Sequence, residues 1–170
     1  VNGNIKMVLG NHEPSEMSQN DISGLSNVRT IEERYKMLAD DWTNDPVYSS
    51  EIMKSKDGRD NIMMIYLDNG GQHAYNKLQL EKFKADITVA RQKNLPVLIF
   101  QHIPLGTGVG QLIDVGDDEY TKALDSEIRK SADVVKAIFC GHMHSDSVDY
   151  LQTLNADGSV SSNTIPQYTV

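Results

Sequence analysis

Short apolar runs alternate with longer amphipathic segments along this chain, and the alternation predicts an α/β fold. Three runs, at residues 5–9, 97–100 and 137–140, are largely apolar, and each is followed by glycine or a polar residue. Strands that are buried on both faces of a parallel sheet have this composition. We therefore expect these runs to form parallel strands whose carboxyl ends meet at one edge of the sheet.

Apolar residues recur at helical spacing in segments between the strands. We expect helices over residues 31–42, from Asn76 to just before Pro96, and over residues 120–131. Asn76 and Gln79 are spaced as a capping box, which marks the start of the second helix. A repeated order of helix then strand is typical of parallel units with helical crossovers. The predicted core face of the second helix consists of Leu80, Phe83, Ile87 and Ala90.

Two further segments predict β-hairpins. Residues 50–56 and 61–67 flank the turn signal Asp57-Gly58, and residues 147–154 and 159–170 flank a second Asp-Gly turn. We expect the second hairpin to lie at the edge of the sheet. The length and the pattern together predict a single domain over residues 1–170.

Composition and charge narrow the function classes. The 170 residues carry a net charge of −8, which argues against sequence-independent nucleic-acid binding. No apolar run approaches the length of a membrane span, so we expect no membrane insertion. No export signal is visible, and we take a cytoplasmic location as the working expectation. The single cysteine, Cys140, excludes an internal disulfide and, at a strand end, is interpreted as a small buried apolar residue.

Polar segments follow the three predicted parallel strands directly. They are Gly10-Asn11-His12-Glu13, Gln101-His102 and Gly141-His142-Met143-His144. Because the strands end at one edge of the sheet, four of the five histidines can converge there although they lie far apart in sequence. Neutral imidazoles that converge are typical ligands of transition metals. The pattern therefore indicates a metal site at this edge.

The three segments resemble the downstream motifs of the calcineurin-like metallophosphoesterases. They occur in the same order along the chain, and each follows a predicted strand. The resemblance runs from about residue 7 to residue 146. It implies an α/β/β/α sandwich of mixed sheets flanked by helices, and hydrolysis of phosphoric esters by metal-activated hydroxide. It leaves open whether the enzyme is a phosphomonoesterase or a phosphodiesterase, and which phosphate ester is its substrate.

The resemblance also implies the ligands of a two-metal site that clamps a phosphoryl group. One ion would be bound by Asn11, His102 and His142, and the second by His144. Imidazole suits Mn, Fe and Zn, and the amide oxygen of Asn11 is a harder ligand, so all three divalent metals stay open.

His12 and Glu13 would act as a catalytic pair and not as metal ligands. By resemblance, His12 lies over the substrate and either protonates the leaving oxygen or stabilises charge in the transition state. Glu13 would accept the other ring N–H of His12 and so fix its tautomer.

The family pattern also contains an Asp-x-His and a Gly-Asp motif, and neither precedes Gly10 in this sequence. We therefore expect the chain to be the C-terminal portion of such a domain, truncated on its N-terminal side and of low activity alone. An unpaired sheet edge favours pairing, so we expect a homodimer or complementation by the missing portion. The alternative function is a non-catalytic metal-binding or interaction module that keeps the fold without a complete two-metal site.

Some polar residues have simpler interpretations. His142 and His144 could form a polar loop pair without a metal, and His73 lacks a motif and is expected in a surface loop. Four acids in a glycine-containing loop are expected to be solvated, namely Asp114, Asp117, Asp118 and Glu119.

Overall fold

The computed structural model describes residues 6, 8, 10, 47–70 and 73–170. The predicted helix over residues 31–42 lies outside the described residues, as does most of the predicted strand over residues 5–9. The elements below therefore belong to the part of the chain from residue 47 onward.

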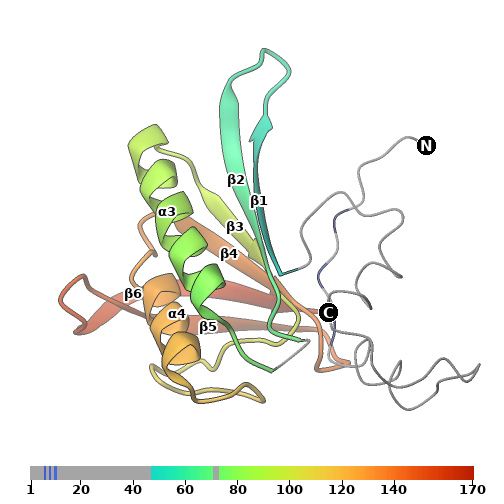
Figure 1. Ribbon diagram of the computed structural model, residues 1–170, viewed down its shortest axis with the longest axis vertical. Coiled ribbons are helices and arrows are strands. Elements are labelled where there is room, and N and C mark those ends of the chain that lie inside the picture. The colour runs from blue at the N-terminus through green and yellow to red at the C-terminus, as the bar shows by residue number, and fades with distance from the viewer. Residues whose placement is uncertain (1–5, 7, 9, 11–46, 71–72) are drawn as a thin grey trace, which may run out of the picture.

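A mixed sheet of six strands forms the centre of the described part (Figure 1). Its strand order is β1-β2-β3-β4-β6-β5, and β2, β3, β4 and β6 run parallel to one another. Within these residues, the antiparallel strands β1 and β5 are the two edges of the sheet. The strands are β1 (Tyr48–Lys54), β2 (Asp60–Leu67), β3 (Val97–Phe100), β4 (Val135–Cys140), β5 (Ser147–Leu154) and β6 (Val160–Thr169).

Helices α3 (Lys77–Lys93) and α4 (Glu119–Arg129) lie on one face of the sheet (Figure 1). The predicted capping box opens α3: the Asn76 side chain accepts from the Gln79 N–H at 3.0 Å, and the Gln79 side chain accepts from the Asn76 N–H at 2.9 Å. The helix ends at Asn94, whose φ of 54° is left-handed. Neither helix of the described part is long and apolar enough to cross a membrane.

The apolar core lies between these helices and the sheet. The predicted core face of α3 is confirmed for Phe83, Ile87 and Ala90, which are at most 3% exposed, whereas Leu80 is partly buried. Burial of a side chain as large as Phe83 or Ile87 stabilises the fold by about 1.5–3 kcal/mol. The other large buried residues of this core include Leu124 and Ile128 of α4 and Ile65, Ile99 and Ile138 of the parallel strands.

The α/β class, the mixed sheet with flanking helices and both hairpins are therefore as predicted. Strands β1 and β2 form the first hairpin, and β5 and β6 form the second, with β5 at the sheet edge. The described residues form one sheet of this architecture.

Helix α4, which was predicted over residues 120–131, begins one residue earlier than predicted because Asp118 is its N-cap. One carboxylate oxygen of Asp118 accepts from the N–H groups of Tyr120 and Thr121, at 2.9 and 3.1 Å. The other accepts from the Thr121 hydroxyl at 2.6 Å, and that hydroxyl accepts from the Tyr75 N–H at 3.0 Å. Asp118 is exposed, as expected, but it also joins α4 to the segment before α3.

Replacing Asp118 with alanine is expected to lower the free energy of unfolding by about 1 kcal/mol at pH 7, the usual effect of losing an N-cap. Burial alone would raise the pKa of Asp118, but the hydrogen bonds from Thr121 and Tyr120 outweigh it and hold the pKa below its usual value. A lowered folded-state pKa means that this stabilisation is complete above the unfolded-state pKa of about 3.9 and is lost as the pH falls through the folded value.

Urea denaturation of the wild type and Asp118→Ala at several pH values would measure both effects. The control is Asp118→Asn, which keeps a good capping oxygen and should retain most of the stability at pH 7. Equal stability of the wild type and Asp118→Ala at that pH would contradict the role as N-cap.

The opposite face of the sheet carries a row of stacked aromatic rings. Ile65, Ile99 and Ile138 point toward the helices, so their strand neighbours point to the other side. There the rings of Tyr66, Phe100, Phe139 and Tyr168 stack in sequence, with centroids 5.2, 5.1 and 5.3 Å apart. Phe139 and Tyr168 are 36% and 39% exposed, so part of this face is exposed apolar surface, on the side of the sheet away from the aliphatic core.

Candidate metal centre

His102 and His142 follow the carboxyl ends of the neighbouring parallel strands β3 and β4. Their ring centroids are 5.2 Å apart, and the two ring planes are inclined by 78°. The predicted convergence of strand-end histidines is therefore confirmed for this pair. His144 is exposed two residues further on, in a left-handed conformation with φ of 52°. Asn11, His12 and Glu13 lie outside the described residues.

The backbone connects the two histidine segments directly. The N–H of Gly141 donates to the carbonyl oxygen of His102 at 2.9 Å, continuing the ladder between β3 and β4 beyond the strands. The His102 ring lies against Gly141, since a Cβ atom at position 141 would be 3.4 Å from His102 Nδ1. The two imidazoles are therefore carried by segments with a fixed relative position.

Buried polar side chains hold the loop that follows His102. Gln167 of β6 accepts from the Leu105 N–H at 2.8 Å and donates to the Leu105 carbonyl at 3.0 Å. Arg129 of α4 donates to the carbonyl of Gly106 at 2.6 Å. Gly106 has no room for a side chain, because a Cβ atom there would lie 2.1 Å from the carbonyl oxygen of Gln111. The loop thus leaves the site along a path set by β6 and α4.

Asp114, farther along the same loop, contacts two histidines. Its carboxylate oxygen Oδ2 lies 2.8 Å from His142 Nε2, and its backbone oxygen lies 2.8 Å from His73 Nδ1. The side chains of Asp114 and His73 are 54% and 40% exposed, as expected for a surface loop. Asp114 is thus solvated, as expected, but it also contacts His142, and His73 lies beside the site, its ring 6.4 Å from that of His142.

The contact with Asp114 assigns the proton of His142. A carboxylate accepts only, so Nε2 of the neutral imidazole carries the hydrogen and Nδ1 keeps the lone pair. A carboxylate on one ring nitrogen while the other remains available is the usual arrangement behind a histidine metal ligand. Sequence patterns gave no signal for this contact, because 28 residues separate the partners and both lie outside regular elements.

Cys140 immediately precedes this region but has the properties of a core residue. It is 4% exposed, and burial raises the pKa of its thiol to about 12. Metal binding by cysteine requires the thiolate. The interpretation of Cys140 as a small buried apolar residue is therefore confirmed.

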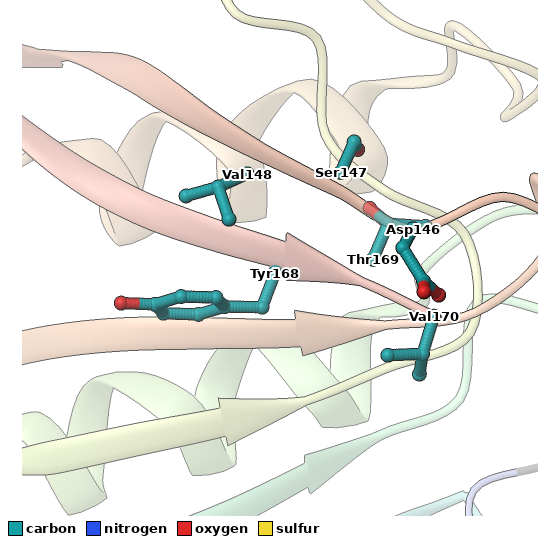
Figure 2. Close-up of a pocket in the computed structure, with 6 residues that line it drawn as sticks. All are labelled: Asp146, Ser147, Val148, Tyr168, Thr169 and Val170. Atoms are coloured by element: carbon teal, nitrogen blue, oxygen red, sulfur yellow. The ribbon is translucent and has the colours of Figure 1, made fainter.

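A shallow hollow lies at the same edge of the sheet (Figure 2). Its volume is about 380 Å³, and its walls are Asp146, Ser147, Val148, Tyr168, Thr169 and Val170. The N–H of Val170 donates to the carbonyl of Cys140 at 3.1 Å, which places the hollow next to the segment that carries His142. Most of this surface is apolar, whereas the histidine side of the edge is polar.

The donor set fits part of the coordination shell of one transition-metal ion. Two imidazoles that bind the same ion at about 2.1 Å have ring centres roughly 5 Å apart, as in the pair His102 and His142. Among the residues that the structure describes, no group of three or more His, Cys, Asp or Glu side chains is arranged to hold an ion. Within the described part, the candidate metal centre therefore rests on the pair His102 and His142.

Comparison with known proteins places these motifs in a family. A family model described as calcineurin-like phosphoesterase matches residues 1–146. Among solved structures, a dimetal phosphatase from Danio rerio is similar at 16% sequence identity with a TM-score of 0.43, and the match covers 71% of this chain and 48% of that chain. This chain thus spans about half the length of that structure. No curated protein matches the chain.

Proposed function

Since this chain belongs to the calcineurin-like phosphoesterase family, we propose that it forms part of a metal-dependent phosphoric ester hydrolase. The observation that carries the proposal is the approach of His102 and His142, whose ring centroids are 5.2 Å apart at the carboxyl edge of the parallel strands. Ligands bind at this edge in open α/β sheets. Metal ligands in such a site come from different strands, as these two do.

We assign the residues as follows. One divalent ion would be held by Asn11, His102 and His142, and a second ion would use His144. The donor types suit Mn, Fe or Zn. When bound, divalent ions supply Lewis-acid activation of water and neutralise charge on the phosphoryl oxygens.

The chain's own residues supply orientation and proton transfer. His12 would donate a proton to the leaving oxygen of the ester, and Glu13 would hold the other ring nitrogen of His12. Asp114 keeps the imidazole of His142 in one tautomer through its contact with Nε2. The substrate would be a phosphomonoester or a phosphodiester.

The same contact favours a second candidate function. In a non-catalytic interaction module that keeps the fold, the hydrogen bond between His142 and Asp114 would hold the loop in place and need no ion. The hydrolase requires metal binding followed by turnover, whereas the interaction module requires no turnover, with or without a bound ion.

The test is hydrolysis of p-nitrophenyl phosphate and bis(p-nitrophenyl) phosphate by the wild type and His142→Ala, with Mn, Zn or Fe(II) added. We expect slow hydrolysis that requires added metal, stops on chelation and is absent from the variant. Metal binding at the histidines without turnover of either ester would support the non-catalytic module. If the wild type neither binds metal nor hydrolyses either ester, the proposed hydrolase function is contradicted.

A further inference from the structure

Asn69 lies two residues after the end of β2 and makes hydrogen bonds with the backbone of the segment that carries His102. It is fully buried, and its Oδ1 accepts from the N–H groups of His102 and Ile103, at 3.1 and 2.8 Å. Its Nδ2 donates to the Ile103 carbonyl at 2.8 Å and to the Tyr75 hydroxyl at 3.2 Å. We propose that Asn69 is a positioning residue that holds the backbone of His102 where its imidazole meets that of His142.

This inference rests on the proposed function, in which His102 and His142 bind one ion. It concerns a side chain that is not itself a ligand. A contact of this kind matters because metal affinity depends on how well the ligands are oriented before the ion binds.

The orientation of the Asn69 amide follows from its partners. The N–H groups of His102 and Ile103 can only donate, so the atom that faces them must be the amide oxygen. The carbonyl of Ile103 can only accept, so the atom that faces it must be the amide nitrogen. Both amide hydrogens and the amide oxygen of Asn69 therefore have hydrogen-bond partners in only one of the two possible orientations of the amide group.

Tyr75 and Gln101 close this network. The Tyr75 hydroxyl donates to Gln101 Oε1 at 2.7 Å, and Gln101 Nε2 donates to the Ile103 carbonyl at 2.9 Å. Both residues are 3% exposed. Burial raises the pKa of Tyr75 well above its usual value, so its hydroxyl keeps the proton that it donates. Buried networks in which every group is paired favour a single geometry.

The backbone of His102 is held on both sides of its Cα atom. Its N–H donates to Asn69, and its carbonyl oxygen accepts from the N–H of Gly141 at 2.9 Å. Gly141 directly precedes His142, so the second bond reaches the other ligand segment. Loss of Asn69 removes one of these two constraints and leaves the buried N–H of Ile103 and the partly buried N–H of His102 without this partner, which favours a shift of the segment.

Gln167 provides a matched control. It is a buried carboxamide, 1% exposed, and it also bonds with the backbone of the loop after β3. Its partner there is Leu105, through the N–H at 2.8 Å and the carbonyl at 3.0 Å. Gln167→Ala therefore removes similar hydrogen bonds three residues from His102.

The experiment compares Asn69→Ala with Gln167→Ala in two measurements on the full chain. The ¹⁵N signals of the His102 and His142 imidazoles in metal-free protein report ring position and tautomer. Titration with Mn²⁺ reports affinity. We expect Asn69→Ala to shift or broaden the His102 signals and to weaken Mn²⁺ binding roughly 10–100-fold, whereas Gln167→Ala changes neither by much. Thermal unfolding of both variants shows whether their losses of stability are similar.

The imidazole signals decide the inference, and the titration decides the proposed function. Unchanged His102 signals in Asn69→Ala, or the same change in Gln167→Ala, would overturn the positioning role. If Asn69→Ala fails to fold, the same imidazole signals are measured in Tyr75→Phe, which removes only one hydroxyl of the network. Unchanged His102 signals in that variant would likewise overturn the positioning role. Absence of Mn²⁺ binding by the wild type would contradict the metal site, and the signals would still test the role of Asn69.

Discussion

Replacing Arg129 with methionine is expected to lower the free energy of unfolding by about 3–5 kcal/mol, because the carboxylate of Asp125 would stay buried without its partner. Arg129 is fully buried and Asp125 is 3% exposed. The Arg129 Nε donates to both carboxylate oxygens, at 3.0 and 2.9 Å, and the guanidinium also donates to the carbonyl oxygens of Gly106 and Gln152. Denaturation in guanidinium chloride at pH 7 would measure the loss.

The matched control is Arg91→Met, which removes an arginine–aspartate ion pair at the surface. Arg91 donates to the two oxygens of Asp133 at 2.7 and 2.9 Å, and the side chains are 46% and 54% exposed. Exposed pairs contribute at most about 1 kcal/mol. Similar losses for the two variants would show that burial is not the source of the effect at Arg129.

Replacing His142 with alanine is expected to weaken the binding of Mn²⁺ or Zn²⁺ at least about 100-fold, because loss of a direct ligand exceeds the effect of losing an outer hydrogen-bond partner. Under the proposed assignment the ion keeps only the imidazole of His102 from the described part of the chain. Isothermal titration of metal into the chelator-treated protein would measure the change.

His73→Ala is the control for this variant. His73 has φ of 52° and His142 has φ of 73°, so both substitutions place alanine in the left-handed region. Both histidines already adopt this conformation, so the two substitutions should change the backbone energy by similarly small amounts. His73 contacts the loop through Asp114, so its loss should affect affinity much less. Equal losses of affinity would mean that the ion does not bind through His142.

The elements of this fold could be predicted because their signals are local. Asn76 and Gln79 lie three residues apart and determine the start of α3, and an Asp-Gly pair marks the turn of each hairpin. The apolar periodicity of α3 matched its buried face. The order of strands had no such local signal, since β6 and not β5 pairs with β4.

The candidate site could be predicted only where its residues follow strands directly. Two parallel strands bring His102 and His142 together, whereas every ligand and catalytic assignment stays a prediction, including those of Asn11, His12, Glu13 and His144. The supporting contacts were invisible in the sequence. Asn69 is 33 residues from His102. The residue type arginine does not show whether the side chain is buried, as that of Arg129 is. Such contacts depend on the tertiary path of the loop, which no short pattern encodes.

The row of stacked rings has a consequence for the accuracy of folding. Strand β3 has only four residues, so its ladder of hydrogen bonds alone would tolerate a slip against β2 or β4. A slip of one residue would turn Phe100 toward the helices, separate it from the rings of Tyr66 and Phe139, and force an aromatic side chain into the filled aliphatic layer. The stacked rings thus disfavour misaligned pairings of β3, and the correct register places His102 opposite Gly141, the residue before His142.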